Sequence, residues 1–234
     1  MRNSLLLRAA SIGAVCIVVT ATPAPANTQD ECTQSDDWWL RIKACTAAIE
    51  SPRWTGALAA WAYSNRAVAH AALGNALEAF DDHRKAVSLN PNDPVARNNK
   101  GNSHADFREY KRALAEYDSA IRLRPGYVNA YYNRANAHFA LEDFAAAVDD
   151  FSVVLEDRPD DGDALTGRAE ARCLAGDIEG SVGDRLDALR LGTLALDDTA
   201  AYLQETGYLR QDAEAETIDA IAPGLAAWTE AGCP

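Results

Sequence analysis

The stretch AYYNRANAHFALEDFAAAVDDFSVVLEDRP, residues 130–159, decides the fold. Small residues stand at Ala135 and Ala147, Asp143 lies between them, and Pro159 closes the stretch where a helix should stop. An Asp before a helix can accept hydrogen bonds from exposed backbone N–H groups. The stretch therefore predicts two helices that pack as a hairpin, with small residues where the helices approach closely.

The same pattern repeats every 34 residues. Shifting the sequence by that interval aligns residues 60–93, 94–127, 128–161 and 162–195. Small residues recur at two positions of each unit, which are Ala67, Gly101, Ala135 and Ala169, and then Ala79, Ala113, Ala147 and Ser181. Prolines close the first three units, and a polar residue precedes each second helix, at Asn75, Glu109, Asp143 and Asp177. Asn and Asp there can cap the exposed backbone N–H groups, whereas Glu109 adds dipole stabilisation. Each unit is therefore predicted to be a helical hairpin.

A 34-residue helix-turn-helix repeat with this pattern resembles the tetratricopeptide repeat family. The resemblance covers residues 60–195 and implies an all-α fold, a right-handed superhelix of antiparallel helical hairpins known as a TPR solenoid. It also implies a non-catalytic role in protein–protein interaction. The fourth unit is degenerate, because Thr193 replaces the closing proline and Arg185 replaces the usual aromatic residue.

The segments outside the repeats are expected to cover the ends of the solenoid. In residues 27–59, the segment 39–50 looks like a lone second helix with Asp36 as its N-cap, so we expect a half-hairpin there. Residues 196–234 are expected to form C-terminal capping helices. The sequence predicts one helix at 198–207, capped by Asp198 or Thr199, and another at 217–231, interrupted at Pro223-Gly224.

Residues 1–26 have the features of a secretory signal peptide. Basic residues stand near the start, residues 9–19 are apolar, and Ala24-Pro25-Ala26 supplies small residues at the cleavage positions. An uncleaved membrane anchor is the alternative, but the apolar run is well short of the roughly 20 residues needed to span a bilayer. We therefore expect a periplasmic or secreted protein with no membrane span after signal cleavage.

Four cysteines follow the predicted cleavage site. An even number of cysteines in an exported protein indicates disulfides, and four cysteines allow three connectivities. Because the cysteines fall into a pair at each end of the chain, we predict Cys32–Cys45 and Cys173–Cys233. No Cys-x-x-Cys spacing is present, so zinc and thioredoxin-type sites are not expected.

Composition and motifs exclude several function classes. The chain has 234 residues and a formal net charge of -13, which argues against a general phosphate-neutralising surface and hence against a nucleic-acid partner. There is no Gly-x-Ser-x-Gly, phosphate-loop or His-Glu-x-x-His motif. The Asp160-Asp161-Gly162-Asp163 segment lacks the ligand spacing of a calcium loop. We expect no enzyme activity, no cofactor and no metal.

A basic residue in each first helix is followed 16 residues later by an acidic residue in the second helix. Both residues lie equally far from the turn, so an antiparallel hairpin brings them to the same level. Four structural ion pairs within the repeats are therefore expected. The pairs are Arg66 with Asp82, Lys100 with Glu116, Arg134 with Asp150, and Arg168 with Asp184.

Histidines recur at one position of the first helices, at His70, His104 and His138, and Arg172 continues the series. Equivalent atoms in stacked hairpins lie about 8–10 Å apart, whereas a zinc ion needs nitrogen ligands at about 2.1 Å. One ion therefore cannot collect these histidines. We expect them to pack between helices in place of an aromatic residue.

Asparagines form a stripe along the first helices, and the family resemblance places this stripe on the concave face. Solvation of an exposed face is the plainer alternative, but Asn is a poor helix former, so its recurrence needs a reason. A ladder of side-chain amides can bond the main chain of an extended peptide without fixing its sequence. The predicted groove comprises Asn65, Asn98, Asn99, Asn102, Asn129, Tyr132, Asn133, Asn136 and Phe139.

One familiar subtype of the family is not expected. Members that hold a partner's C-terminal carboxylate are similar to one another in carrying Lys and Arg along this stripe. Here Ser64 and the asparagines stand at those positions.

The sequence thus predicts a non-catalytic scaffold or adaptor of the cell envelope that binds a protein or peptide partner. An alternative is a peptidoglycan-associated module acting through the tail, because Leu203-Gln204 and Gly207-Tyr208 are similar to half of the small peptidoglycan-binding domain pattern. The other half fails, since Ala220 follows Asp219 and the interval to Trp228 is too short. At most a weak cell-wall contact is expected. A cryptic enzyme is the least favoured hypothesis.

Overall fold

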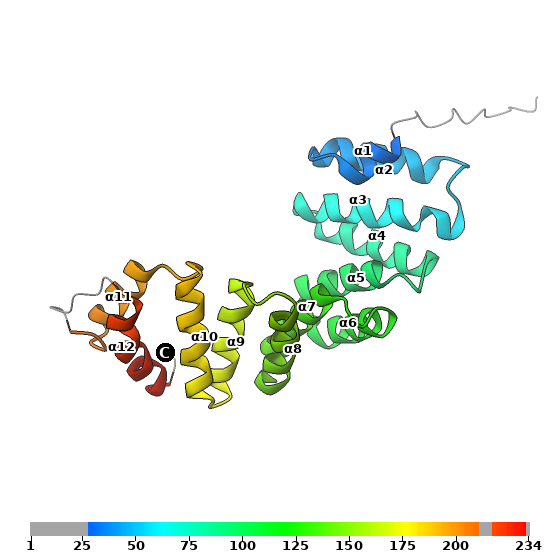
Figure 1. Ribbon diagram of the computed structural model, residues 1–234. Helices are drawn as coiled ribbons and strands as arrows, with labels where there is room; N and C mark the ends of the chain where they lie inside the picture. Colours follow the sequence, from blue (N-terminus) through cyan, green and yellow to red (C-terminus); the bar gives the residue numbers. More distant parts are fainter. Residues whose placement is uncertain (1–27, 211–216, 233–234) are drawn as a thin grey trace, which may run out of the picture.

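The computed structural model describes residues 28–210 and 217–232. In these residues the chain is all-α, and antiparallel hairpins stack side by side into an elongated, curved solenoid with α1 and α12 at opposite ends (Figure 1). This confirms the predicted all-α helical solenoid.

Four helical hairpins make up the body of the solenoid. Within each hairpin the two helices pack antiparallel, and each second helix also contacts the first helix of the next hairpin. The first helices begin 34 residues apart. The hairpins are α3 (Ala60–Ala72) with α4 (Ala76–Leu89), α5 (Pro94–Asp106) with α6 (Tyr110–Leu123), α7 (Val128–Ala140) with α8 (Phe144–Asp157), and α9 (Gly162–Leu174) with α10 (Ile178–Arg190).

Small residues let the paired helices approach. The side chains of Ala67, Ala135 and Ala147 are fully buried. At Gly101 a Cβ atom would lie 2.7 Å from Cδ1 of Tyr117, an aromatic side chain that is 1% exposed. The second hairpin therefore requires Gly where the other hairpins have Ala.

Only two of the four residues that precede the second helices cap them with a side chain. Asp177 accepts a hydrogen bond from the Gly180 N–H at 3.0 Å, and Asp143 accepts a longer one. The cap predicted at Asn75 is wrong, because the Asn75 side chain makes no bond to the helix N-terminus. Its amide nitrogen lies 3.4 Å from Nδ1 of His70 instead. Glu109 also makes no side-chain cap, and the dipole role expected of it stays a prediction.

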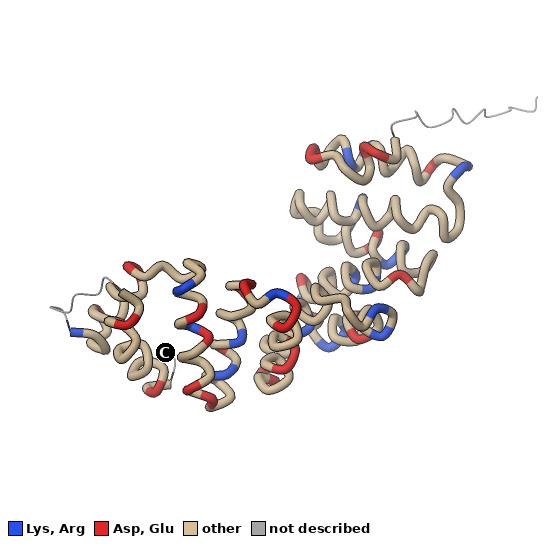
Figure 2. The backbone as a smooth tube through the Cα atoms, viewed as in Figure 1, with Lys and Arg blue, Asp and Glu red and all other residues tan. Residues whose placement is uncertain are grey.

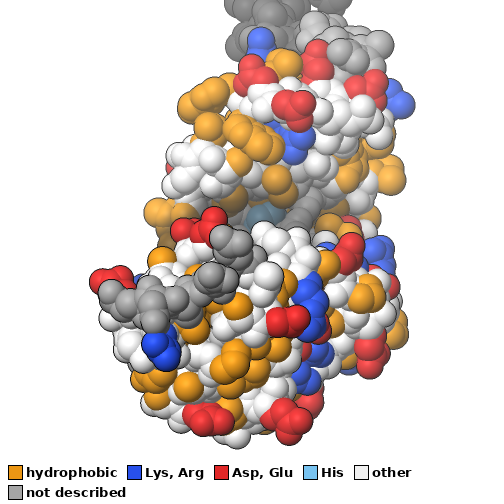
Figure 3. Space-filling model, turned by 60° about the vertical axis from the view of Figure 1, so that its left-hand side comes forward, with side chains coloured by type: hydrophobic (Ala, Val, Ile, Leu, Met, Phe, Trp, Pro, Cys, Tyr) orange, Lys and Arg blue, Asp and Glu red, His pale blue; other side chains and the backbone are white. Residues whose placement is uncertain are grey.

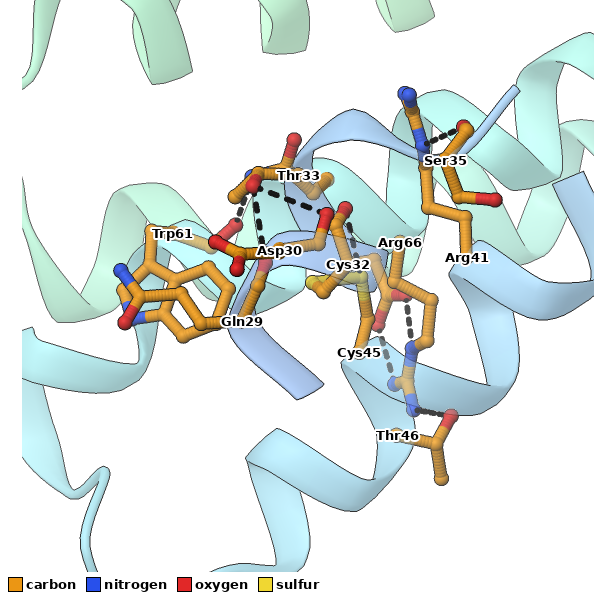
Figure 4. Close-up of a disulfide and its surroundings, with 12 residues drawn as sticks. Gln29, Asp30, Cys32, Thr33, Ser35, Arg41, Cys45, Thr46, Trp61 and Arg66 are labelled. Carbon is orange, nitrogen blue, oxygen red and sulfur yellow. Dashed lines mark hydrogen bonds and ion pairs between the residues drawn. A yellow bond between two sulfur atoms is a disulfide. The ribbon is translucent and has the colours of Figure 1, made fainter. Parts of the chain in front are cut away.

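The N-terminal segment is a complete small hairpin, so the prediction of a lone helix there is wrong. A short helix α1 (Thr28–Gln34) packs on α2 (Trp38–Glu50), and the predicted Cys32–Cys45 disulfide joins them (Figure 4). The disulfide supplies a constraint that a helix of this length needs. The N-cap of α2 is Asp37 rather than Asp36, because Asp37 Oδ1 accepts from the Trp39 and Leu40 N–H groups.

The hairpin of α1 and α2 joins the repeats through α3. A short 3-10 helix η1 (Gly56–Ala59) leads directly into α3. Arg66 of α3 donates to the Thr46 hydroxyl of α2 at 3.0 Å, which Figure 4 shows beside the disulfide. Cys32, Cys45 and Ala62 share one buried cluster, so the disulfide is part of the packing between cap and solenoid.

The C-terminal tail differs from its predicted form in two places. Helix α11 (Leu196–Glu205) begins two residues early, with Ala195 as an N-cap that makes no side-chain bond. The predicted caps are wrong because Thr199 instead donates to the Ala195 carbonyl within the helix, at 2.7 Å. Its partner, α12 (Ile218–Glu230), runs through Pro223 without interruption.

Packing explains the continuity of α12. Pro223 is exposed, so water can bond the carbonyl that its missing N–H leaves free. Ile221 and Leu225 are buried on the opposite side and hold the helix against the rest of the tail. At Gly224 a Cβ atom would lie 2.8 Å from the Tyr208 carbonyl oxygen, so this glycine allows a close backbone approach.

Two predictions fall on residues that the structure does not describe. The signal peptide at 1–26 lies outside the described residues, and so does Cys233 of the predicted Cys173–Cys233 pair. Cys173 is buried on α9, with its sulfur 3.9 Å from the Thr229 carbonyl oxygen of α12. Within residues 28–210 and 217–232, no helix is both long and apolar enough to cross a membrane.

Candidate peptide-binding groove

Two adjoining hollows lie along helices α5 and α7. The first, of about 420 Å³, is lined by Asn98, Asn99, Asn102, Asn129, Tyr132 and Asn133, together with residues named below. The second, of about 400 Å³, shares Asn102 and Asn133 with the first and adds Asn136, Tyr110 and Tyr117. The shared residues make the two hollows one continuous surface, which we call the amide groove.

Several amides of the groove keep hydrogen-bonding capacity. Asn129 and Asn136 are exposed, and their side-chain amides make no hydrogen bond to another described residue. Asn102 accepts from the Tyr117 hydroxyl at 2.9 Å, and its own N–H donors bond to no described residue. Each free amide offers both a donor and an acceptor, which matches the two polar groups of a peptide unit.

Asn98 has a structural part as well. It is 4% exposed, and its Oδ1 accepts from Nδ2 of Asn133 at 2.9 Å. The bond joins α5 to α7 across the boundary between two hairpins. Asn98 therefore fixes the position of Asn133, one of the two amides shared by both hollows.

Two residues of the predicted groove lie outside these hollows. The Asn65 amide donates to the Trp61 carbonyl of its own helix at 2.8 Å. The Phe139 ring packs edge-on against Phe144, with centroids 5.4 Å apart, and joins the core around α8. Asn65 occupies the same repeat position as Asn99 and Asn133, so its different role reflects its different neighbours.

The groove contains charged and aromatic residues that the Asn pattern did not predict. Asp163 continues the series that contains Asn129, so the repeat spacing could have identified it. Tyr127 and Asp161 precede successive first helices, outside the helical positions of the Asn stripe, so that stripe does not predict them. Asp161 also caps α9 by accepting from the Ala164 N–H at 3.0 Å.

The groove is acidic overall. Its acids are Asp106, Asp161 and Asp163, against Arg158, which pairs with Asp161 at 3.3 Å. Burial raises the pKa of the Asp106 carboxyl above its ordinary value. Along the described chain as a whole, Lys and Arg are interspersed with Asp and Glu (Figure 2). A groove of this charge does not suit a ligand that presents a carboxylate.

The structure brings together all four residue pairs of the basic and acidic series. Three are two-pronged arginine contacts, with N–O distances between 2.7 and 2.9 Å, and the fourth joins Lys100 to Glu116 at 2.6 Å. The buried partners Asp150 and Asp184 are 6% and 4% exposed at the side chain. These pairs lie between the helices of one hairpin and fix their relative height.

The arginines also reach back to the preceding hairpin. Arg134 donates to Asp118 of α6 at 2.7 Å, and Arg168 donates to Ser152 of α8 at 3.2 Å. Hydrogen bonds to Asp150 raise the pKa of the Arg134 guanidinium well above its ordinary value. The series therefore joins neighbouring hairpins as well as the two helices of each.

The second hairpin uses a variant of this arrangement. Glu116 accepts from Lys100 at 2.6 Å and from Arg97 at 2.9 Å, both on α5. Burial would raise the pKa of the Glu116 carboxyl, but these two hydrogen bonds outweigh it and leave the pKa below its ordinary value. Lys100 and Arg97 thus replace the two-pronged arginine that the other three hairpins have at the position of Lys100.

The histidine series lies at the turns of the hairpins. His104 Nδ1 lies 2.7 Å from Glu109 Oε2, five residues later and just before the second helix. The same spacing joins His70 to Asn75, His138 to Asp143 and Arg172 to Asp177. His104 also packs edge-on against Phe80, so the expected packing role is joined by a role in holding the turn. Among the described residues, no group of three or more His, Cys, Asp and Glu could hold a metal ion.

Known structures share this fold. A crystal structure of MamA superposes with a TM-score of 0.60 at 17% identity, covering 67% of this chain and 90% of the MamA chain. A structure of MamA MSR-1 gives the same TM-score at 14% identity and covers 71% of this chain and 95% of its own. A MamA RS-1 double mutant gives a TM-score of 0.58 at 19% identity, covering 74% and 94%. At these identities the likeness shows the fold alone.

No curated protein sequence matches the chain. The family model for the tetratricopeptide repeat does match it, at residues 54–128, 98–162 and 132–195. These overlapping matches run from the start of the first hairpin to the end of the fourth and cover more than half of the sequence. The chain therefore belongs to the tetratricopeptide repeat family.

Proposed function

We propose that this protein is a non-catalytic adaptor that binds an extended polypeptide segment in the amide groove. The observation that carries the proposal is the continuity of the two hollows on α5 and α7, with exposed, unbonded amides at Asn129 and Asn136. Such amides can bond the main chain of a peptide whatever its sequence. The aromatic rings of Tyr110 and Tyr132 offer apolar contact beside them.

Export to an oxidising compartment is part of the proposal. Its support is the disulfide between Cys32 and Cys45 and the signal-like sequence of residues 1–26. Edman or mass-spectrometric sequencing of the protein recovered from its host tests this directly. Cleavage before Asn27 is the expected result, and an intact N-terminus in the cytoplasmic fraction would contradict it.

A photo-crosslinking amino acid at position 129 tests the groove. The exposed Asn129 lies in the groove, whereas Arg84 lies exposed on α4 outside both hollows and serves as the control position. We expect extended polypeptide partners to crosslink from position 129 and not from position 84. Equal yields from the two positions would remove the groove as the binding surface.

Substitution of the amides supplies the matched comparison. The double variant Asn99→Ala/Asn133→Ala removes two groove amides and should reduce crosslinking from position 129 several-fold, while Asn65→Ala removes the equivalent amide outside the groove and should leave it unchanged. Once a peptide is identified, methylation of its backbone nitrogens should weaken binding if the amides read the main chain. Unchanged affinity after methylation would mean that side chains are recognised instead.

The tail has a packing role that accounts for its peptidoglycan-like residues. Leu203 is 1% exposed and lies with Tyr208 in the cluster between α10, α11 and α12. We therefore assign the tail to capping and do not propose a cell-wall function.

A further inference from the structure

A third cavity lies at the other end of the solenoid, between α10 and the tail helices. Its volume is about 440 Å³, within the usual range for small-molecule sites. The walls include Leu194, Leu203 and Leu225, with Tyr202 and Trp228 beside them. Figure 3 turns this end of the molecule forward and shows hydrophobic side chains exposed among Asp and Glu. The cavity is separate from the amide groove.

Arg185 is the cationic residue among those that line the cavity. It occupies a repeat position that is aromatic in the other three hairpins. The equivalent residues 34 positions apart are His83, Tyr117 and Phe151, and all three are buried. In the fourth hairpin the tail helix α12 packs on α10, and the Arg185 guanidinium carbon lies 4.5 Å from the centre of the Trp228 ring. A cation thus occupies the place where the other hairpins have a ring.

Arg185 forms no ion pair with a carboxylate of the described residues, and the effect of burial on its pKa is only partly offset by the nearby charge of Glu170. Its one hydrogen bond there is a long one, from Nε to the Ser181 hydroxyl at 3.5 Å. The neighbouring Asp184 is engaged by Arg168 and Arg172. Burial lowers the pKa of Arg185, whereas hydrogen bonds to Asp82 raise that of Arg66. A half-buried guanidinium without an ion pair, such as that of Arg185, is stabilised more by a bound anion than a guanidinium that already holds a carboxylate.

A second donor without an acceptor lies on the same wall. The Trp228 indole nitrogen is buried and has no hydrogen-bond partner among the described residues. The Trp228 side chain lines the cavity, so a ligand bound there changes the surroundings of the indole ring. The one acid on the wall, Asp198, is exposed at the start of α11 and forms no ion pair with Arg185. The negative charge of Asp198 repels anionic ligands, and it repels a dianion such as a phosphate more strongly than a monoanion.

We propose that this cavity binds a small monocarboxylic acid carrying an aliphatic or aromatic group. The carboxylate bonds the Arg185 guanidinium, which matches its planar shape, and the apolar group lies against Leu194, Leu203 and Leu225. The site is built by the tail packing on the last hairpin. It uses none of the residues assigned to the amide groove, so each proposal stands or fails without the other.

Titration of the purified chain with octanoate, and with octanol as the uncharged probe of equal chain length, tests the site. The readout is the indole N–H signal of Trp228 in a nitrogen–proton NMR spectrum, assigned by its loss in Trp228→Phe. We expect octanoate to shift this signal saturably and to bind at least about tenfold more tightly than octanol. Equal affinities would overturn the proposal, and so would the absence of a saturable shift.

Variants of the wall give the second arm. Arg185→Gln should weaken octanoate binding by about tenfold and leave octanol unchanged, while Asp198→Asn should strengthen octanoate binding. Arg190→Gln is the control, because Arg190 lies on the same helix, paired with Asp187 and outside the cavity. An Arg185→Gln protein that folds and binds octanoate normally would overturn the assignment. If that variant does not fold, the comparison of octanoate with octanol on the unchanged chain still tests whether the cavity recognises a carboxylate.

A peptide arm separates a free acid from a chain end. A short peptide ending in leucine is titrated with a free C-terminus and with an amidated one. We expect both forms to bind more weakly than octanoate. Tighter binding of the free-ended peptide than of octanoate would overturn the small-acid assignment in favour of a polypeptide C-terminus.

Discussion

Arg134 donates to Asp118 of the preceding hairpin while it holds Asp150 of its own hairpin with two further bonds. The two carboxylates differ in burial, since the Asp118 side chain is 47% exposed and that of Asp150 is 6% exposed. One guanidinium therefore serves two interfaces of unequal depth. The energetic weight of each interface can be measured separately.

Truncation of the two carboxylates should give unequal losses. Asp150→Ala leaves a half-buried guanidinium short of its main partner and should lower the free energy of unfolding by about 2–3 kcal/mol. Asp118→Ala removes an exposed pair and should cost less than about 1 kcal/mol. Urea unfolding followed by circular dichroism measures both. Equal losses would show that burial does not set the strength of these pairs.

Two glycine substitutions should change stability in opposite directions. Gly101→Ala places a methyl group against the buried Tyr117 ring and should destabilise by about 1–3 kcal/mol. Gly183 lies exposed in the middle of α10, where an added Cβ would meet no side chain within 4 Å, so Gly183→Ala should stabilise by about 0.5–1 kcal/mol because Ala is the better helix former. Thermal melts compare them, and a stabilised Gly101→Ala protein would contradict the packing described.

His83 should make stability depend on pH. Burial lowers the pKa of its imidazole from 6.5 to about 4, and its Nδ1 lies 2.8 Å from the Ser103 hydroxyl. Between these values the unfolded chain binds a proton that the folded chain does not. Stability should therefore fall as pH drops from about 6.5 to about 4, by up to about 3 kcal/mol.

The control for this pH dependence comes from the chain itself. The double variant His83→Phe/Ser103→Ala introduces the residue types found at Phe151 and Ala137, the equivalent positions of later hairpins. Its unfolding free energy should vary less over that pH range than that of the unchanged chain. An identical pH profile would assign the dependence to other groups.

Removal of the Cys32–Cys45 disulfide should loosen the N-terminal cap alone. The bond closes a short loop, for which the chain-entropy model gives about 2–3 kcal/mol. In Cys32→Ala/Cys45→Ala, amide hydrogen exchange should accelerate in α1 and α2 and stay unchanged in α7. Faster exchange in α7 as well would show that the cap and the repeats unfold as one unit.

The repeats could be predicted from the sequence because their determinants are local. Small residues, prolines and charges recur every 34 residues, and each acts within one hairpin or between neighbours. The five-residue spacing from His104 to Glu109 is also present in the sequence, but spacing alone does not distinguish a bond across the turn from packing between helices. The ends of the chain have no such recurrence, so the start of α11 and the passage of α12 through Pro223 depend on packing that spacing does not report.

The groove could be predicted only in part for a similar reason. A series of equivalent residues lies on one stripe, but each member meets different neighbours. Asn99 and Asn133 face the hollows, whereas Asn65 bonds the backbone of its own helix next to the N-terminal cap. Charges at the hairpin junctions, such as Asp161, enter the groove from outside the helical pattern.

The tail helix α12 occupies the place on α10 where a fifth hairpin would otherwise stack. Consequently the array cannot be lengthened at this end without displacing the tail. A duplicated hairpin, by contrast, can be accommodated between existing ones, since each presents equivalent surfaces to its two neighbours. The packing of α12 on α10 thus sets where the described array of hairpins ends on its C-terminal side.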